Sequence, residues 1–215
     1  MKRFTLAAAL CISLAGCQTA YYSAMEKVGV HKREILVDRV EATKESQQES
    51  QEEFQSALER LTTLINFDGG ELQSAYEQLN DDYESSSSAA NNVSGNINKV
   101  EDVAEALFSE WEDELTQYSS ATLKRESEKK LKQTQRQFNK LLRSMRSSED
   151  KMQPVLSSLK DNVLYLKHNL NAQAIAAIRG EFKSLKSDIQ SLIDDMNRSI
   201  ADSNKFIEQM NTSNT

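Results

Sequence analysis

A repeat of apolar and small residues between Leu72 and Trp111 limits what this chain can fold into. Its members follow one another at alternating steps of four and three residues, without interruption: Leu72, Tyr76, Leu79, Tyr83, Ser86, Ala90, Val93, Ile97, Val100, Ala104, Leu107 and Trp111. A 3.5-residue period keeps one stripe of a helix facing the same partner, as in coiled coils. At ~1.5 Å per residue the repeat predicts a rod of roughly 60 Å, and its narrow stripe needs other helices to cover it.

The rest of the chain carries stripes of the same kind. One proline and six glycines in 215 residues leave few helix breakers. We therefore expect an all-α fold: an elongated antiparallel bundle of long helices with coiled-coil packing, at about 25–65, 71–118, 122–170 and 173–210. Residues 25–211 then form a single bundle and 212–215 a frayed tail. The stripe of the first helix is Leu36, Val40, Thr43, Gln47, Ser50, Phe54, Ala57, Leu61 and Leu64.

Polar residues interrupt the first two stripes near their middles. Residues 41–53 are almost wholly polar, and residues 85–92 contain only serine, alanine and asparagine. Folding the chain back about Gly69 would place Gln47–Ser50 opposite Ser86–Ala89. This register predicts a polar waist between two better-packed ends of the bundle. A flexible linker at the serine run is the alternative.

Two blocks of opposite charge predict the next boundary. Residues 101–114 hold seven acidic and no basic residues, whereas residues 124–146 hold nine basic and two acidic ones. A turn near Ser119–Thr122 would lay the blocks side by side, where complementary charge sets register. One unbroken helix is the alternative. In the following helix Pro154 predicts a kink near residues 147–154, or a new helix that starts there.

The first residues have the pattern of a bacterial export signal. Lys2 and Arg3 precede an apolar run, Phe4–Leu14, that is too short to span a bilayer. The segment Leu14-Ala15-Gly16-Cys17 resembles the lipobox of bacterial lipoproteins, in which the leader is removed and the cysteine is acylated. This resemblance implies that residues 1–16 are a signal peptide, that Cys17 carries lipid and that residues 17–24 are an acylated tether. An ordinary signal peptide with a chance cysteine is the alternative.

The residue after Cys17 indicates the destination. Inner-membrane lipoproteins of enteric bacteria often carry aspartate there, whereas this chain has Gln18. By that resemblance we expect an anchor in the outer membrane of the bacterial cell envelope, with the protein facing the periplasm.

Composition and motifs argue against several functions. The chain has 26 basic and 33 acidic residues, a net charge of -7, and loss of Lys2 and Arg3 with the leader would make it -9. Acidic surfaces repel phosphate backbones, so we expect no nucleic-acid partner. There is no P-loop, Rossmann glycine pattern or Gly-x-Ser-x-Gly elbow, and His31 and His168 have no metal-ligand spacing. We expect no nucleotide, metal or other cofactor, and no enzyme activity.

Two clusters are candidate binding surfaces. The first is a candidate contact with an anionic surface: Lys124, Arg125, Lys129, Lys130, Lys132 and Arg136. Its alternative is that the acidic block of the same chain neutralises these cations. The second is a candidate contact with a partner protein, at the end of an up-down-up-down bundle far from the anchor: Phe67, Asp68, His168, Asn169 and Asn171. Its alternative is helix capping by the asparagines, with Phe67 covering the end of the bundle.

Two segments carry a family resemblance. Tyr21–Arg33 (YYSAMEKVGVHKR) and Tyr165–Ile175 (YLKHNLNAQAI) are similar to segments of an uncharacterised proteobacterial family. That family is a domain of unknown function, helical and coiled-coil in expectation, and often carries a lipoprotein leader. The resemblance spans most of the chain after Cys17 and implies no activity.

We therefore expect an outer-membrane-anchored periplasmic lipoprotein that acts as a structural or protein-interaction coiled-coil module. Its partners would be the membrane, through the lipid anchor, and an unknown envelope protein, with self-association also open. The alternative is a membrane-binding or membrane-shaping module similar to curved, BAR-like helical bundles. The basic block favours that alternative, and the acidic net charge disfavours it.

Overall fold

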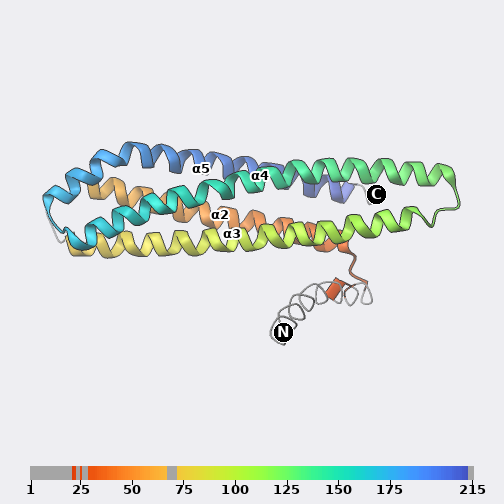
Figure 1. Cartoon of the computed structure of the whole chain (residues 1–215), viewed down its shortest axis with the longest axis horizontal. Helices are drawn as coiled ribbons and strands as arrows, with labels where there is room; N and C mark the ends of the chain where they lie inside the picture. The colour runs from red at the N-terminus through yellow and green to blue at the C-terminus, as the bar shows by residue number, and fades with distance from the viewer. Residues whose placement is uncertain (1–20, 23–24, 26–28, 67–71, 213–215) are drawn as a thin grey trace, which may run out of the picture.

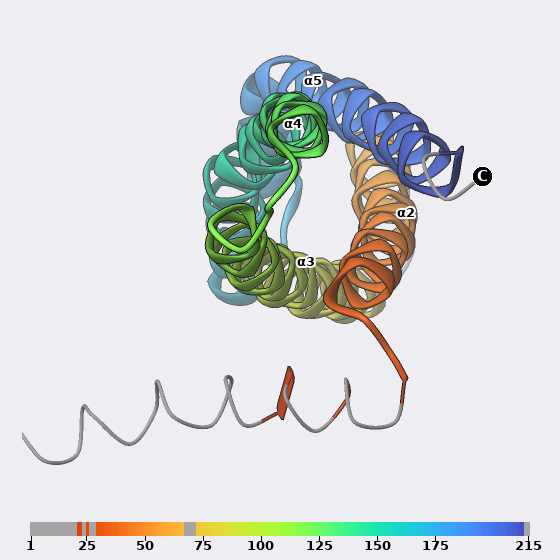
Figure 2. The same cartoon turned by 90° about the vertical axis from the view of Figure 1, so that its right-hand side faces the viewer.

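The computed structural model describes residues 21–22, 25, 29–66 and 72–212. These residues form four long helices: α2 (Lys32–Ile65), α3 (Leu72–Leu115), α4 (Ala121–His168) and α5 (Ala172–Thr212). Each helix packs against two others, in the cyclic order α2, α3, α4, α5. Figure 1 shows them side by side along one axis, and Figure 2 shows the ring that they form around the core. The expected all-α elongated bundle is confirmed.

The core is one continuous cluster along the axis of this bundle. All nine predicted stripe positions of α2 are buried, and so is the α3 repeat at eight positions: Leu79, Ser86, Ala90, Val93, Ile97, Val100, Ala104 and Leu107. Three aromatic rings close the core toward the α3–α4 connection. The Phe138 ring lies 5.5 Å from that of Phe108 and 6.1 Å from that of Phe206, between ring centroids.

The first helix of the bundle starts later than the sequence predicts. Instead of beginning near residue 25, α2 begins at Lys32. The reason is Gly29, whose φ of 86° lies in the left-handed region, through which an α-helix cannot continue. The Val30 N–H donates to the Met25 carbonyl across this turn, at 3.0 Å. As a result α2 has 34 residues, whereas α3 has 44 and α4 has 48.

The boundary between the charge blocks is a turn, so one unbroken helix is excluded. α3 ends at Leu115 and α4 begins at Ala121, where the Ser120 hydroxyl accepts from the Leu123 N–H at 3.4 Å. A single helix then passes through Pro154, so no new helix starts at residues 147–150. Pro154 is exposed, and water can therefore bond the carbonyl that lacks a helical partner. The kink near Pro154 stays a prediction.

α2 ends, and α5 begins, at the same end of the rod. The Arg179 Nε, near the start of α5, donates to the Ile65 carbonyl at the end of α2, at 3.1 Å. At the opposite end the Arg33 guanidinium donates to the Met210 carbonyl at 2.5 Å. We call the end with Ile65 and Arg179 the far end, because α2 enters the bundle at the other one. Within the described ranges, none of the helices has a stretch long and apolar enough to cross a bilayer.

Candidate functional site

Polar residues from all four helices are buried in the middle part of the bundle. Each of them is at most 5% exposed: Thr43, Ser46, Gln47 and Ser50 from α2, Ser86 from α3, Ser148 from α4, and Asp195, Ser199 and Ser203 from α5. We call this set the polar waist. Thr43, Gln47 and Ser50 of α2 and Ser86 of α3 belong to the stripes predicted from the sequence, and their burial is confirmed. The buried polar residues of the waist that no predicted stripe contained are Ser46, Ser148, Asp195 and Ser199.

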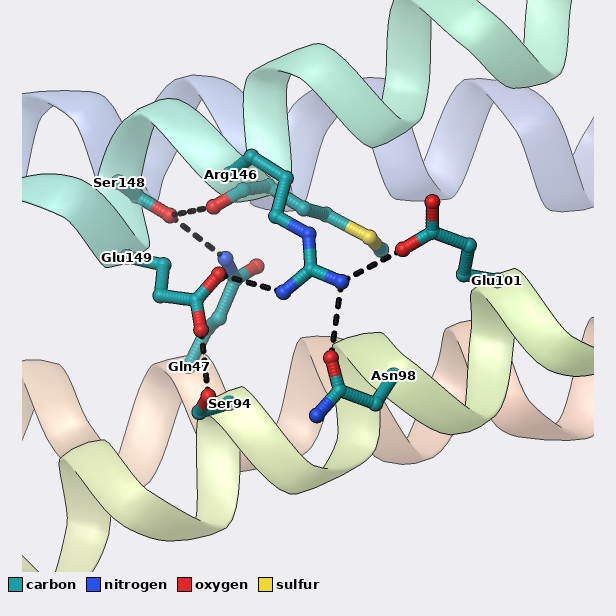
Figure 3. A network of polar contacts seen from close by, with 8 residues as sticks. Gln47, Ser94, Asn98, Glu101, Arg146, Ser148 and Glu149 are labelled. Carbon is teal, nitrogen blue, oxygen red and sulfur yellow. Dashed lines mark hydrogen bonds and ion pairs between the residues drawn. The ribbon is translucent and has the colours of Figure 1, made fainter. Parts of the chain in front are cut away.

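A hydrogen bond crosses the waist between α2 and α4. The Gln47 Nε2 donates to the Ser148 Oγ at 2.9 Å, and that hydroxyl donates to the Met145 carbonyl at 2.8 Å (Figure 3). Other polar atoms of the waist have no hydrogen-bond partner among the described protein atoms, namely the Gln47 Oε1 and the hydroxyls of Ser50, Ser86 and Ser199. A buried polar atom without a partner costs about 1–3 kcal/mol, so the waist lowers the stability of the bundle.

The rim of the waist holds a network centred on Arg146. Its guanidinium contacts Glu149 at 2.8 Å in the same helix, and Glu101 at 2.6 Å and Asn98 at 2.8 Å in α3 (Figure 3). Glu149 also accepts a hydrogen bond from the Ser94 hydroxyl. Burial opposes the charge of Arg146, but the hydrogen bonds to Glu149 and Glu101 outweigh it and raise the pKa of the guanidinium. The network therefore fixes the register of α3 against α4.

A second charge cluster lies where α4 meets α5. The carboxylate of Asp195 is only 4% exposed, and its Oδ2 lies 2.6 Å from the Lys151 Nζ. Arg198, one turn along α5, also pairs with Asp195. Throughout the described ranges, no three His, Cys, Asp or Glu side chains gather as a set of metal ligands. The polar contacts of the waist and its rim thus join neighbouring helices, and we assign them the role of fixing how the helices align along the bundle axis.

Replacing Gln47 by methionine should raise the free energy of unfolding by about 1–2 kcal/mol. The unbranched shape is kept, the buried Oε1 without a partner is removed, and the Ser148 hydroxyl keeps its bond to Met145. Urea unfolding of Gln47→Met measures the gain. Gln51→Met is the matched control in α2, because Gln51 contacts Asn197 at the surface, at 3.1 Å. A loss of stability in Gln47→Met alone would contradict this account.

The six candidate anionic-surface residues lie on the first part of α4, and all are exposed. The Lys132 Nζ lies 2.6 Å from Glu128 in the same helix, and this hydrogen bond lowers the pKa of Glu128. Across the described part of the chain, the other five form no ion pair: Lys124, Arg125, Lys129, Lys130 and Arg136. In the same ranges, a single ion pair, Arg146–Glu101, joins the acidic and basic blocks. The blocks lie side by side as predicted, but most of their charges face solvent.

The candidate partner contacts fall into two groups. Phe67 and Asp68 lie outside the described residues, as does Cys17. His168 ends α4 and is exposed. The Asn169 Nδ2 donates to the Tyr165 carbonyl at 2.9 Å, and the Asn171 Oδ1 accepts from the N–H groups of Gln173 and Ala174, at 3.0 and 3.1 Å. The two asparagines therefore cap helices, as the alternative interpretation of the sequence proposed.

Sequence reasoning missed an apolar surface at the far end. Leu164, Tyr165 and Leu170 are 45%, 44% and 39% exposed. Tyr165 also lines an open groove of about 330 Å³ between α4 and α5, together with Asp161, Asn162, Ala177, Ile178 and Glu181. We call the three exposed residues and this groove the far-end surface. One feature of the sequence could have indicated this surface: Leu164 and Tyr165 are adjacent large apolar residues that lie outside the buried stripe of α4.

In the described part of the four helices and their connections, large exposed apolar side chains lie only near the ends of the rod. Among the described residues of the four helices and their connections, Tyr118 and Leu123 lie at the α3–α4 turn, and Leu164, Tyr165 and Leu170 lie at the far end. Tyr21 precedes α2 and is also exposed.

Comparison with known proteins gives a family and no activity. A family model described as a protein of unknown function (DUF2959) matches residues 21–210, which include all four helices. No curated protein matches the chain, and no solved structure matches it.

Proposed function

The chain belongs to the DUF2959 family of proteins of unknown function, and we propose that it acts as a membrane-anchored spacer. In this proposal it is a lipoprotein of the outer membrane that faces the periplasm. Lipid on Cys17 holds one end of the rod, and the far-end surface binds an envelope protein. The observation that carries the proposal is the confinement of large exposed apolar side chains to the two ends.

The shape of the bundle suits a spacer. α4 alone has 48 residues, which at ~1.5 Å per residue is roughly 70 Å. α2 begins at one end of the rod, and the far-end surface lies at the other. A partner on that surface would therefore be held tens of ångströms from the lipid anchor. The bundle packs around one continuous core, so it would keep this distance under load.

The anchor rests on the lipobox-like segment that ends in Cys17. Acylation of that residue by several chains would hold the protein firmly, because a single acyl chain binds a bilayer only marginally. After a high-salt wash, which removes proteins held by charge alone, the Cys17→Ser variant should be found in the soluble periplasmic fraction and the unchanged protein in the membrane fraction.

The far-end surface has the chemistry of a protein contact. Its groove is lined by the apolar residues Ala177 and Ile178 and by Tyr165, and also by the acidic residues Asp161 and Glu181. An apolar side chain of a partner would fill the groove, and a basic residue beside it would meet the two carboxylates. The capping bonds of Asn169 and Asn171 hold the turn next to this surface in place.

Membrane shaping is the less favoured function. A BAR-like module would carry its cations along one long face, whereas the densest group of exposed cations among the described residues lies on the first turns of α4: Lys124, Arg125, Lys129, Lys130 and Lys132. In the body of the bundle, Lys140, Arg146 and Lys151 pair with carboxylates of the same or neighbouring helices. This distribution suits contact at the end of the rod.

Replacing Leu164 and Leu170 together by serine should reduce capture of the partner at the far end by about tenfold or more, because buried apolar contacts carry most interface energy. The measurement is crosslinking in cells, with a photo-crosslinker at Tyr165 or His168 of the acylated protein. A crosslinker at Asp188, exposed on the side of α5, is the control. One defined envelope protein captured at Tyr165 and absent at Asp188 supports the spacer. Equal capture at both positions, or capture of the chain itself alone, contradicts it.

A further inference from the structure

The α3–α4 hairpin projects beyond the four-helix part of the bundle. The Lys32 Nζ, at the start of α2, lies 2.9 Å from Glu110, which marks the level where α2 begins. α3 runs five residues further, and Figures 1 and 2 show the turn to α4 standing clear of α2 and α5. We call residues 115–130 the hairpin tip. At ~1.5 Å per residue, the first ten residues of α4 alone extend about 15 Å.

The hairpin holds its own small core, which keeps its end in shape. Leu115 and Leu131 are buried, yet both lie outside the main core cluster. The Trp111 Nε1 donates to the Ser127 hydroxyl at 2.8 Å, and the Gln135 amide donates to Glu112 at 3.0 Å. The tip is therefore a fixed surface.

The end of this hairpin is apolar and cationic. Leu123 is 58% exposed, the most exposed large apolar side chain among the described residues, and Tyr118 is 42% exposed. From Leu115 to Arg125 there are two cations, Lys124 and Arg125, and no acidic residue. The nearest acidic residues on α3 precede Leu115, so they lie behind the tip.

The four cations of the tip outnumber its two carboxylates, Glu126 and Glu128. Within the described residues, Lys124, Arg125, Lys129 and Lys130 form no ion pair, and all four are exposed. Glu128, the paired carboxylate of this region, contacts Lys132. An apolar side chain beside free cations matches a bilayer surface, where leucine enters the acyl boundary and lysine and arginine meet anionic headgroups.

The tip lies at the end of the rod where the chain from Cys17 enters. We propose that the hairpin tip is a second membrane contact, which docks Leu123, Tyr118 and the adjacent cations on the anionic headgroups of the bilayer that holds the lipid. Only the orientation of the rod rests on the proposed anchor. The contact itself needs no acyl chain.

Vesicle binding by the unacylated chain tests the contact. Residues 18–215 contain every described residue, so this chain keeps the whole bundle. We expect it to sediment with mixed phosphatidylcholine and phosphatidylglycerol vesicles, less so at high salt, and far less with phosphatidylcholine alone. The double change Lys124→Glu and Arg125→Glu should weaken binding by about 30-fold, since each basic residue near an anionic surface is worth about fivefold. Leu123→Ser should weaken it about tenfold.

Matched controls separate the tip from general attraction. Lys183→Glu with Lys186→Glu changes two exposed cations of α5, and Leu164→Ser changes an equally apolar residue at the far end. Both controls should bind as the unchanged chain does. The proposal is overturned if the unchanged chain ignores anionic vesicles, if the α5 pair weakens binding as much as the tip pair, or if a crosslinker at Leu123 captures only a protein in cells.

The outcome is independent of the spacer proposal. The vesicle test uses no acyl chain, so a failure of Cys17 to become acylated would leave its result unchanged. Loss of vesicle binding would in turn leave capture at Tyr165 unchanged.

Discussion

Replacing Phe138 by alanine should lower the free energy of unfolding by about 3–5 kcal/mol. The Phe138 side chain is 5% exposed, and its ring makes edge contacts with those of Phe108 and Phe206. These rings come from α4, α3 and α5, so one truncation removes packing from three helices at once. The lost contacts lie where the four-helix core ends and the hairpin begins. The remaining cavity cannot collapse easily, because all three helices continue past it.

Urea unfolding of Phe138→Ala measures this loss, with Phe182→Ala as the matched control. Phe182 is a half-buried phenylalanine of α5, so its truncation should cost about 1–2 kcal/mol. Hydrogen exchange adds a spatial test: amides of the hairpin tip should lose more protection than those near Arg179. Equal stability losses in the two variants would contradict the view that the rings of Phe108, Phe138 and Phe206 stabilise the end of the four-helix core.

The period of the sequence predicts which face of α2 is buried. Every position of its stripe is buried, including Gln47 and Ser50, which hydrophobicity alone would have placed outside. The spacing decides here because a helix held at both ends by Leu36 and Leu64 has no freedom to turn its middle outward. The same logic predicted the burial of Thr43 in α2 and Ser86 in α3, but not that of Ser46, which lies outside the predicted stripe.

The period underestimates the width of the buried stripe in α4. The 3.5-residue period that passes through Leu131, Phe138 and Met145 also selects Leu142 and Glu149, which are only half-buried. It omits four buried residues that follow one another at steps of seven: Leu141, Ser148, Val155 and Asn162. A helix that contacts two neighbours buries three positions in each heptad, whereas a two-stranded stripe buries two. Ser148 and, in α5, Asp195 were missed for this reason.

The projecting hairpin could not be predicted from the stripes. It depends on where α2 starts, and the stripe continues to look helical upstream of Lys32. The backbone conformation of Gly29 ends that continuity, and a single glycine gives only a weak sequence signal. The two charge blocks predicted the turn between α3 and α4, but they did not predict which charged residues form ion pairs. Most of these side chains lie on the outer faces of the two helices and point to solvent. Arg146 and Glu101 pair because both lie at the rim of the waist.

Asp195 is the residue at which burial and charge conflict most. A carboxylate buried without a cation is costly, whereas one that keeps its cations can be nearly neutral for stability. Lys151 and Arg198 reach Asp195 from the surface, and their side chains are 42% and 70% exposed. They would return to water at little cost if the carboxylate were removed. The Asp195 carboxylate, at 4% exposure, would stay buried without a cation if both basic side chains were removed.

Replacing both Lys151 and Arg198 by alanine should therefore destabilise the bundle by about 2–4 kcal/mol, below the usual cost of breaking a fully buried pair because solvent reaches the cations. Lys140→Ala is the control: its 2.6 Å pair with Asp202 joins the same two helices, but that carboxylate is 23% exposed, and the loss should stay under about 1 kcal/mol. Adding Asp195→Asn to the double variant should recover at least half of the lost stability, because a neutral amide does not need a cation. If the triple variant is no more stable than the double one, the loss comes from packing of the Lys151 and Arg198 stems, and the buried charge of Asp195 is not its cause.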